Sequence, residues 1–113
     1  MSMLQQSGMT IIDTHTHLYG LPDSAQVLRE AAAVGVTDVV ALGVDLESNR
    51  KHIGLCRTAC AGPRIFLALG LHPGNITQEE ATDACMRFIR EHIPEAVAIG
   101  ETGLDFWYKW VRK

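Results

Sequence analysis

The sequence has few cysteines and few aromatic residues, no excess of positive charge and no long apolar run. Its three cysteines form an odd set without a close pairing pattern, which favours reduced thiols in a cytoplasmic protein over a disulfide scaffold. The start, "MSMLQQSGMT", lacks the basic cluster and the apolar segment of a secretory signal. No apolar run approaches the length of a membrane span, so we expect no membrane contact.

The net charge of −3 gives no electrostatic case for nucleic-acid binding. It does not exclude a nuclease, because a metal ion in an active site can hold phosphate locally. With 113 residues and 47% hydrophobic content, the chain can build one core. We expect one domain over residues 10–113 and a flexible amino-terminal extension over residues 1–9. Cys56 and Cys60 could meet on one helix face, and we expect them to be small core residues rather than metal ligands.

Four apolar and partly β-branched runs predict strands. They recur about every 28 residues, a spacing that leaves room for a helix and two loops between strands. Continuous apolar runs suit parallel strands that are covered on both faces. The runs are "TIID" (10–13), "DVVALG" (38–43), "RIFLALG" (64–70) and "AVAIGE" (96–101).

Helical periodicity fills the intervals between these runs. Asp23 is expected to cap the first helix, and Thr77 with Glu80 is expected to form a capping box at the start of the third. The second helix is predicted from about residue 47 to residue 61, before "GP" at 62–63. The resulting order βαβαβαβ predicts a parallel sheet with right-handed crossovers. In such sheets the chemistry lies beyond the carboxyl ends of the strands.

Polar side chains of the kinds that bind metals follow all four predicted strands. Side chains two apart on an extended segment point the same way, so His15 and His17 should project together and could hold one ion. The alternative is that two solvent-facing histidines lie there by chance. Glu101 could instead cap a turn before Gly103, and His72 could simply shape a turn before a proline. The residues after the strands are Asp13, His15, His17, Asp45, His72 and Glu101.

Three motifs in this order resemble the TatD family of metal-dependent hydrolases. They are "IIDTHTHLYG" at the first strand, "ALGLHPG" at the third and "AIGETGLDFW" at the fourth. The first motif alone is shared with other amidohydrolases and with histidinol-phosphatase-like phosphoesterases, whereas "GETGLD" separates TatD proteins from them. The resemblance implies an α/β fold, namely the amino-terminal half of a (β/α)8 TIM barrel with four parallel strands and three connecting helices.

The resemblance also implies hydrolysis of phosphodiester bonds in DNA by metal-activated water, with two divalent ions (Zn²⁺, Mn²⁺ or Mg²⁺) in a complete site. His15 and His17 would bind one ion, and Glu101 would be the catalytic carboxylate that bridges both. His72 would donate to the substrate phosphate, and Asp13 would either support a ligand, for example by orienting an imidazole, or have a structural role. Two further histidines and an aspartate of the family site come from strands after the fourth.

Two other functions stay open at this point. One is a small-molecule amidohydrolase, although such enzymes commonly carry a carboxylated lysine where this chain has Glu101. The other is a catalytically inactive metal-binding half-barrel that self-associates through exposed edges. Trp107, Tyr108 and Trp110 could stack on bases or belong to a core or interface. His52 and His92 are expected to be ordinary, partly exposed residues on helices.

Overall fold

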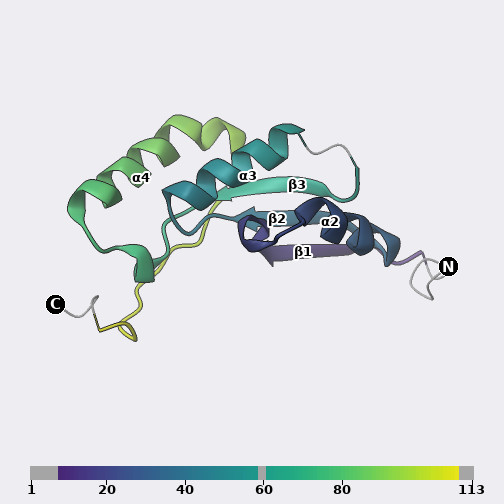
Figure 1. The fold of residues 1–113 in the computed structure, drawn as a ribbon, viewed down its shortest axis with the longest axis horizontal. Coiled ribbons are helices and arrows are strands. Elements are labelled where there is room, and N and C mark those ends of the chain that lie inside the picture. Colours follow the sequence, from purple (N-terminus) through teal and green to yellow (C-terminus); the bar gives the residue numbers. More distant parts are fainter. Residues whose placement is uncertain (1–7, 59–60, 110–113) are drawn as a thin grey trace.

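The computed structural model describes residues 8–58 and 61–109. Most of the predicted amino-terminal extension, together with Cys60 and Trp110, lies outside these residues. Within them, strands alternate with helices and short 3-10 turns (Figure 1). The elements are β1 (Ile11–Thr16), η1 (Leu18–Gly20), α2 (Ser24–Ala33), β2 (Val36–Leu42), α3 (Leu46–Thr58), β3 (Arg64–Leu69), η2 (Pro73–Asn75), α4 (Glu79–His92), η3 (Ile93–Glu95) and β4 (Ala98–Ile99).

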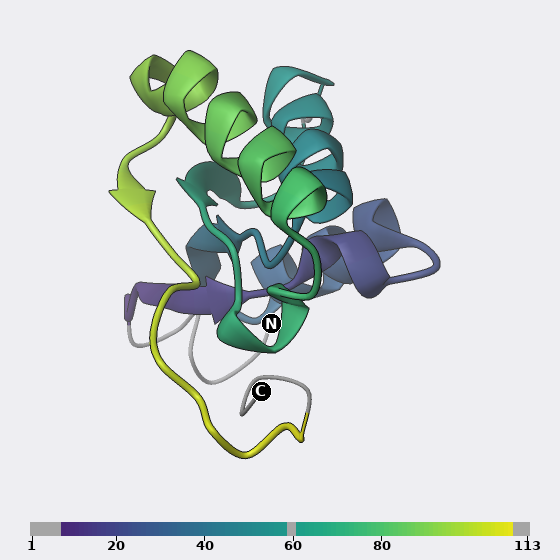
Figure 2. The ribbon, with the colours of Figure 1, turned by 90° about the vertical axis from the view of Figure 1, so that its left-hand side faces the viewer.

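The four strands form one parallel sheet in the order β1-β2-β3-β4, which confirms the predicted architecture. Strands β2 and β3 pair in continuous register, from Asp38 opposite Arg64 to Leu42 opposite Ala68. Helices α3 and α4 run side by side over one face of the sheet, as Figures 1 and 2 show. None of the helices in the described part of the chain combines the length and apolarity needed to cross a bilayer.

Helix boundaries agree with the predicted caps at one helix and differ at another. Asp23 caps α2 as predicted, because its carboxylate accepts a hydrogen bond from the backbone N–H of Gln26 at 3.0 Å. The predicted capping box at Thr77 is wrong: α4 begins at Glu79, and Gln78 occupies the cap position without a side-chain hydrogen bond. Thr77 therefore lies one residue too early to bind the first-turn N–H groups. Two glutamates in the first turn interact favourably with the helix dipole instead.

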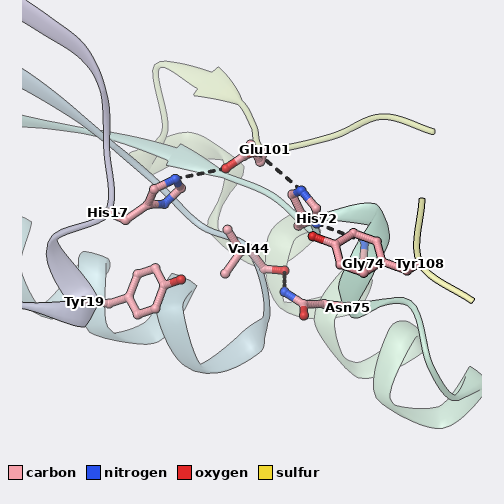
Figure 3. Close-up of a pocket in the computed structure, with 8 residues that line it drawn as sticks. All are labelled: His17, Tyr19, Val44, His72, Gly74, Asn75, Glu101 and Tyr108. Carbon is pink, nitrogen blue, oxygen red and sulfur yellow. Dashed lines mark hydrogen bonds and ion pairs between the residues drawn. The ribbon is translucent and has the colours of Figure 1, made fainter. Parts of the chain in front are cut away.

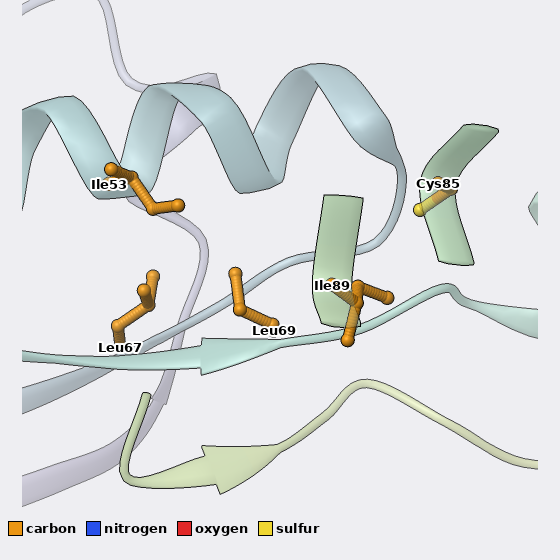
Figure 4. Packing of buried hydrophobic residues seen from close by; sticks show 5 residues of the cluster. All are labelled: Ile53, Leu67, Leu69, Cys85 and Ile89. Atoms are coloured by element: carbon orange, nitrogen blue, oxygen red, sulfur yellow. The ribbon is translucent and has the colours of Figure 1, made fainter. Parts of the chain in front are cut away.

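The core lies between the sheet and the helices. Leu67 and Leu69 of β3 pack against one residue of α3 and two of α4, and Figure 4 shows this cluster of Ile53, Leu67, Leu69, Cys85 and Ile89. A second cluster joins β2 to α2 and the η1 turn through Leu18, Leu28, Val39 and Ala41. Cys85 is buried and Cys56 half-buried, and both are free thiols, as expected for core residues.

The opposite face of the sheet and its two edges are less covered. By alternation Ile12 points away from the helices, and 57% of its surface is exposed, while Val40 and Phe66 are half-buried. Among the described residues, β1 pairs only with β2 and β4 pairs only with β3. The predicted site at the carboxyl ends of the strands therefore lies next to a sheet face and two sheet edges that are only partly covered.

Candidate metal centre

The end of β1 brings its two histidines together. A register irregularity between Asp13 and Thr16 interrupts the pairing of β1 with β2 just where they lie. The Nε2 atoms of His15 and His17 are 3.2 Å apart, and the rings meet edge to face with centroids 5.0 Å apart. The structure thus places both imidazoles on one side of the strand, as the alternation of side chains predicts.

A backbone carbonyl fixes which nitrogen of His17 faces the site. Nδ1 of His17 lies 3.1 Å from the carbonyl oxygen of Leu42 at the end of β2. Because a carbonyl can only accept, Nδ1 must carry the proton, and in the neutral ring Nε2 then presents a lone pair. Metal-binding histidines are typically oriented in this way, with the second ring nitrogen donating to a carbonyl or carboxylate.

Glu101 completes a triangle with the two histidines. Its Oε2 atom lies 3.4 Å from Nε2 of His15 and 3.1 Å from Nε2 of His17. Two ligand atoms bound to a tetrahedral Zn²⁺ at 2.0–2.1 Å would be about 3.3 Å apart, which matches this triangle. The residues present therefore fit a divalent ion, and three polar groups of the right type converge on one point.

His72 has the opposite orientation. Its Nδ1 accepts a hydrogen bond from the backbone N–H of Gly74 at 2.9 Å, which caps the η2 turn. In the neutral ring Nε2 must then carry the proton, so this nitrogen is a donor rather than a metal ligand. Nε2 of His72 lies 3.7 Å from Oε1 of Glu101, on the side of Glu101 away from His17 (Figure 3). His72 therefore caps the turn expected from the following proline and also lies beside Glu101.

Asp13 contacts the backbone of the segment that carries the two histidines. Its carboxylate accepts a hydrogen bond from the backbone N–H of His15 at 3.1 Å. The contact that the structure gives Asp13 is thus with the main chain of His15, which agrees with the structural role that the sequence left open beside the orientation of an imidazole. A carboxylate in this position supports the irregular end of β1 and so the direction of both histidines.

A pocket of about 370 Å³ adjoins the triangle (Figure 3). It includes three polar side chains to which the sequence assigned no site role, or whose role it left open: Tyr19, Asn75 and Tyr108. Asn75 donates from Nδ2 to the carbonyl of Val44 at 2.9 Å, and the backbone N–H of His72 donates to the same oxygen. The only sequence signal for Asn75 is its place directly after "HPG". The pocket is lined by His17, Tyr19, Val44, His72, Gly74, Asn75, Glu101 and Tyr108.

Tyr19 reaches the pocket from the η1 turn, and its neighbour His52 anchors that turn. Burial, with the carboxylates of Asp45 and Glu101, raises the pKa of Tyr19, so its hydroxyl stays protonated as a donor. The backbone N–H of Tyr19 donates to Nε2 of His52 at 3.0 Å. The expectation that His52 is partly exposed is wrong, because the residue is fully buried on the inner face of α3. This burial lowers the pKa of His52 to about 4.

Other polar and aromatic residues near the strand ends have local roles. Asp45 accepts a hydrogen bond from the backbone N–H of Ser48 at 2.8 Å and so supports the start of α3. Asp105 binds the backbone N–H of Trp107 at 2.8 Å and fixes the loop after β4. Trp107 is 80% exposed, and His92, as expected, is half-buried.

The family profile described as TatD related DNase matches residues 12–112. The chain belongs to the TatD family. It is 39% identical over 106 residues to the uncharacterized metal-dependent hydrolase TatD of Mycobacterium tuberculosis, covering 87% of this chain and 38% of that protein. It is 34% identical over 87 residues to the 3′-5′ ssDNA/RNA exonuclease TatD of Citrobacter koseri, covering 74% of this chain and 31% of that protein. The chain thus spans about two fifths or less of these TatD relatives.

Solved structures of TatD proteins have the same fold over this region. The TatD homologue YJJV of Escherichia coli superimposes with a TM-score of 0.70 at 25% identity, covering 90% of this chain and 40% of that one. A TatD family hydrolase of Entamoeba histolytica gives a TM-score of 0.69 at 23% identity, covering 87% and 38%. The resemblance to the TatD family and the predicted half-barrel fold are both confirmed.

Proposed function

We propose that the protein carrying this chain is a metal-dependent phosphodiesterase that acts on DNA, with a divalent ion held by His15, His17 and Glu101. The observation that supports this most strongly is the triangle of Nε2, Nε2 and Oε2 atoms, whose sides measure 3.1–3.4 Å. The name of the Citrobacter koseri relative, an exonuclease of single-stranded DNA and RNA, supports the substrate class.

The proposed ligands suit particular ions. Two neutral imidazoles with one carboxylate favour Zn²⁺, whereas Mn²⁺ or Mg²⁺ would need additional oxygen ligands. A divalent ion bound there would lower the pKa of a water molecule and polarise a phosphate oxygen. The second oxygen of Glu101, Oε1, lies 3.7 Å from Nε2 of His72 and is the atom proposed to bind a second ion. Glu101 is therefore the proposed catalytic carboxylate.

The remaining side chains have distinct proposed tasks. His72 donates from Nε2 to a phosphate oxygen, because its Nδ1 is committed to the N–H of Gly74. The hydroxyl of Tyr19 is a second donor in the same pocket. Asp13 holds the backbone that carries His15. The negative net charge leaves phosphate binding to these donors and to the ion rather than to a basic surface.

Calorimetric titration with Zn²⁺ tests the metal ligands on this chain. The double variant His15→Ala/His17→Ala should lose most of the affinity, because it removes two of three ligand atoms. His92→Ala is the matched control, since this histidine binds the carbonyl of Phe88 at 2.8 Å within α4 and takes no part in the triangle. Equal Zn²⁺ affinity in the double variant and the wild type would refute the assignment.

The 113-residue polypeptide by itself is proposed to self-associate and to cleave DNA little or not at all. Strands β1 and β4 each lack a second neighbour among the described residues, and unpaired edges favour pairing with other chains. Exposed Ile12 and Ile99 add apolar surface next to these edges. Two identical copies would repeat the same three ligands without adding an aspartate from a later strand.

Size-exclusion chromatography with light scattering, followed by a nuclease assay on the same fractions, tests this proposal. A cooperatively melting monomer would contradict the association, and strong cleavage free of contaminating nuclease would contradict the inactivity. The proposed location is the cytoplasm, a proposal that rests on free Cys56 and Cys85.

A further inference from the structure

Three strands end in a glycine where the site begins, and two of these glycines are in very close contact with other groups. A Cβ atom added to Gly43, after β2, would lie 1.7 Å from Oδ1 of Asn49. A Cβ atom added to Gly70, after β3, would lie 2.2 Å from both the carbonyl carbon of Gly100 and the nitrogen of Glu101. At these two points the neighbouring groups occupy the space in which a side chain would lie.

Asn49 is the side chain that fills the space beside Gly43. It lies on α3 and is completely buried. Its Nδ2 donates to the carbonyl oxygen of Gly70 at 2.8 Å, and its Oδ1 accepts from the N–H of Gly70 at 3.1 Å. One amide thus binds both polar backbone groups of a single residue at the end of β3. Asparagine is a weak helix former, so helix propensity gives no reason for its presence here.

The two glycines that Asn49 contacts are also in contact with Glu101, the proposed metal ligand. Gly70 packs against the peptide that joins Gly100 to Glu101. The N–H of Glu101 donates to the carbonyl of Gly43 at 2.8 Å. Glu101 therefore contacts both Gly43 and Gly70, and the amide of Asn49 packs against the first and hydrogen-bonds to the second.

We infer that Asn49 is a positioning residue for Glu101, acting from helix α3 through the backbone of Gly43 and Gly70. This inference rests on the proposed function, because Glu101 matters as a metal ligand. Asn49 itself points into the protein rather than into the pocket, so it acts on the direction and distance of Glu101 from the two histidines. A side chain that positions a ligand in this way typically changes metal affinity about 10–100-fold when removed.

The first perturbation is Asn49→Ala, measured for Zn²⁺ affinity by calorimetry and for folding by circular dichroism. The variant should bind Zn²⁺ about tenfold more weakly, or worse, because Glu101 loses its fixed place. Ile53→Val is the matched control, since Ile53 lies on the same helix, is buried in the core and takes no part in the Asn49 contacts. The control should lower the melting temperature without changing the Zn²⁺ affinity.

The second perturbation, Gly43→Ala, disturbs the same contact between Gly43 and Asn49 by changing the glycine. Gly43 does not have a positive φ, so the added methyl acts through space and not through backbone conformation. It should displace the Asn49 amide and weaken Zn²⁺ binding as Asn49→Ala does. In the double variant Asn49→Ala/Gly43→Ala, the added methyl enters the space that the Asn49 side chain has left. Gly43→Ala should therefore reduce Zn²⁺ affinity less in the Asn49→Ala background than in the wild type. Additive losses of affinity would overturn the inference, because they would show that the two residues act independently.

Hydrogen-exchange mass spectrometry of metal-free protein gives a readout that does not depend on the ion. In Asn49→Ala, the segment 98–103, which contains the Glu101 N–H, should exchange faster relative to the core of β2 than it does in Ile53→Val. Unchanged relative exchange in this segment would overturn the inference. If wild-type protein binds no Zn²⁺, the proposed metal site fails, and the exchange result alone decides the role of Asn49.

Discussion

The buried histidine on α3 makes the stability of this protein depend on pH in a predictable way. His52 is completely buried, accepts a hydrogen bond from the N–H of Tyr19 and has a pKa lowered to about 4 by its burial. In the unfolded chain its pKa is about 6.5. As pH falls below 6.5 the unfolded chain therefore takes up a proton that the folded protein does not. Stability is fully present above pH 6.5 and is lost as pH falls toward 4.

The size of this effect follows from the shift itself. Each unit of pKa difference corresponds to about 1.4 kcal/mol, so the full loss below pH 4 is about 3 kcal/mol. At pH 5 most of this loss has already occurred, and stability is about 2 kcal/mol lower than at pH 7. That is a large part of the 5–15 kcal/mol that typically separates folded from unfolded protein.

Urea unfolding at pH 7 and pH 5, in the presence of a chelator, measures this loss. His52→Gln is the informative variant, because a glutamine oxygen can accept from the N–H of Tyr19 but does not titrate. The wild type should lose about 2 kcal/mol more than His52→Gln between the two pH values. His92→Gln, at a half-buried histidine, should behave like the wild type. Equal losses in wild type and His52→Gln, or an imidazole NMR titration of His52 centred near pH 6.5, would refute the reasoning.

Three further changes have definite expected outcomes. In a complete barrel, Glu101→Gln should reduce phosphodiester hydrolysis nearly as much as Glu101→Ala, since the amide keeps the shape but loses the charge; near-normal turnover of the Gln variant would make Glu101 structural. Gly70→Ala should weaken both folding and Zn²⁺ binding, because its methyl would meet the Gly100–Glu101 peptide; unchanged Zn²⁺ affinity would contradict that contact. The Arg64 guanidinium lowers the pKa of Asp38, so this pair stabilises the fold above about pH 4 and the stabilisation is lost on further acidification. Asp38→Asn should flatten the acid-unfolding curve followed by circular dichroism, and an unchanged curve would argue against the pair.

The sequence predicted the fold because its signals are local and repeated. Four apolar runs separated by helical periodicity specify a parallel alternating fold, and the chain's own caps, such as Asp23, mark where a helix begins. The same logic placed His15, His17, His72 and Glu101 at one end of the sheet, since the ends of parallel strands meet there. Thr77 shows the limit of a local signal, because the capping-box pattern is present in the sequence but α4 begins only at Glu79.

The tertiary structure decided what each of these side chains can do. The carbonyl of Leu42, which is distant in sequence, makes Nδ1 of His17 the donor and leaves a lone pair on Nε2, whereas the N–H of Gly74, two residues further along the chain, makes Nε2 of His72 a donor. Burial of His52 and Asn49 depends on which face of α3 packs against the sheet, which helical periodicity in polar residues does not reveal. The residues that meet at the strand ends were therefore readable from the sequence, whereas the hydrogen bonds that orient each ring were decided by the folded backbone around it.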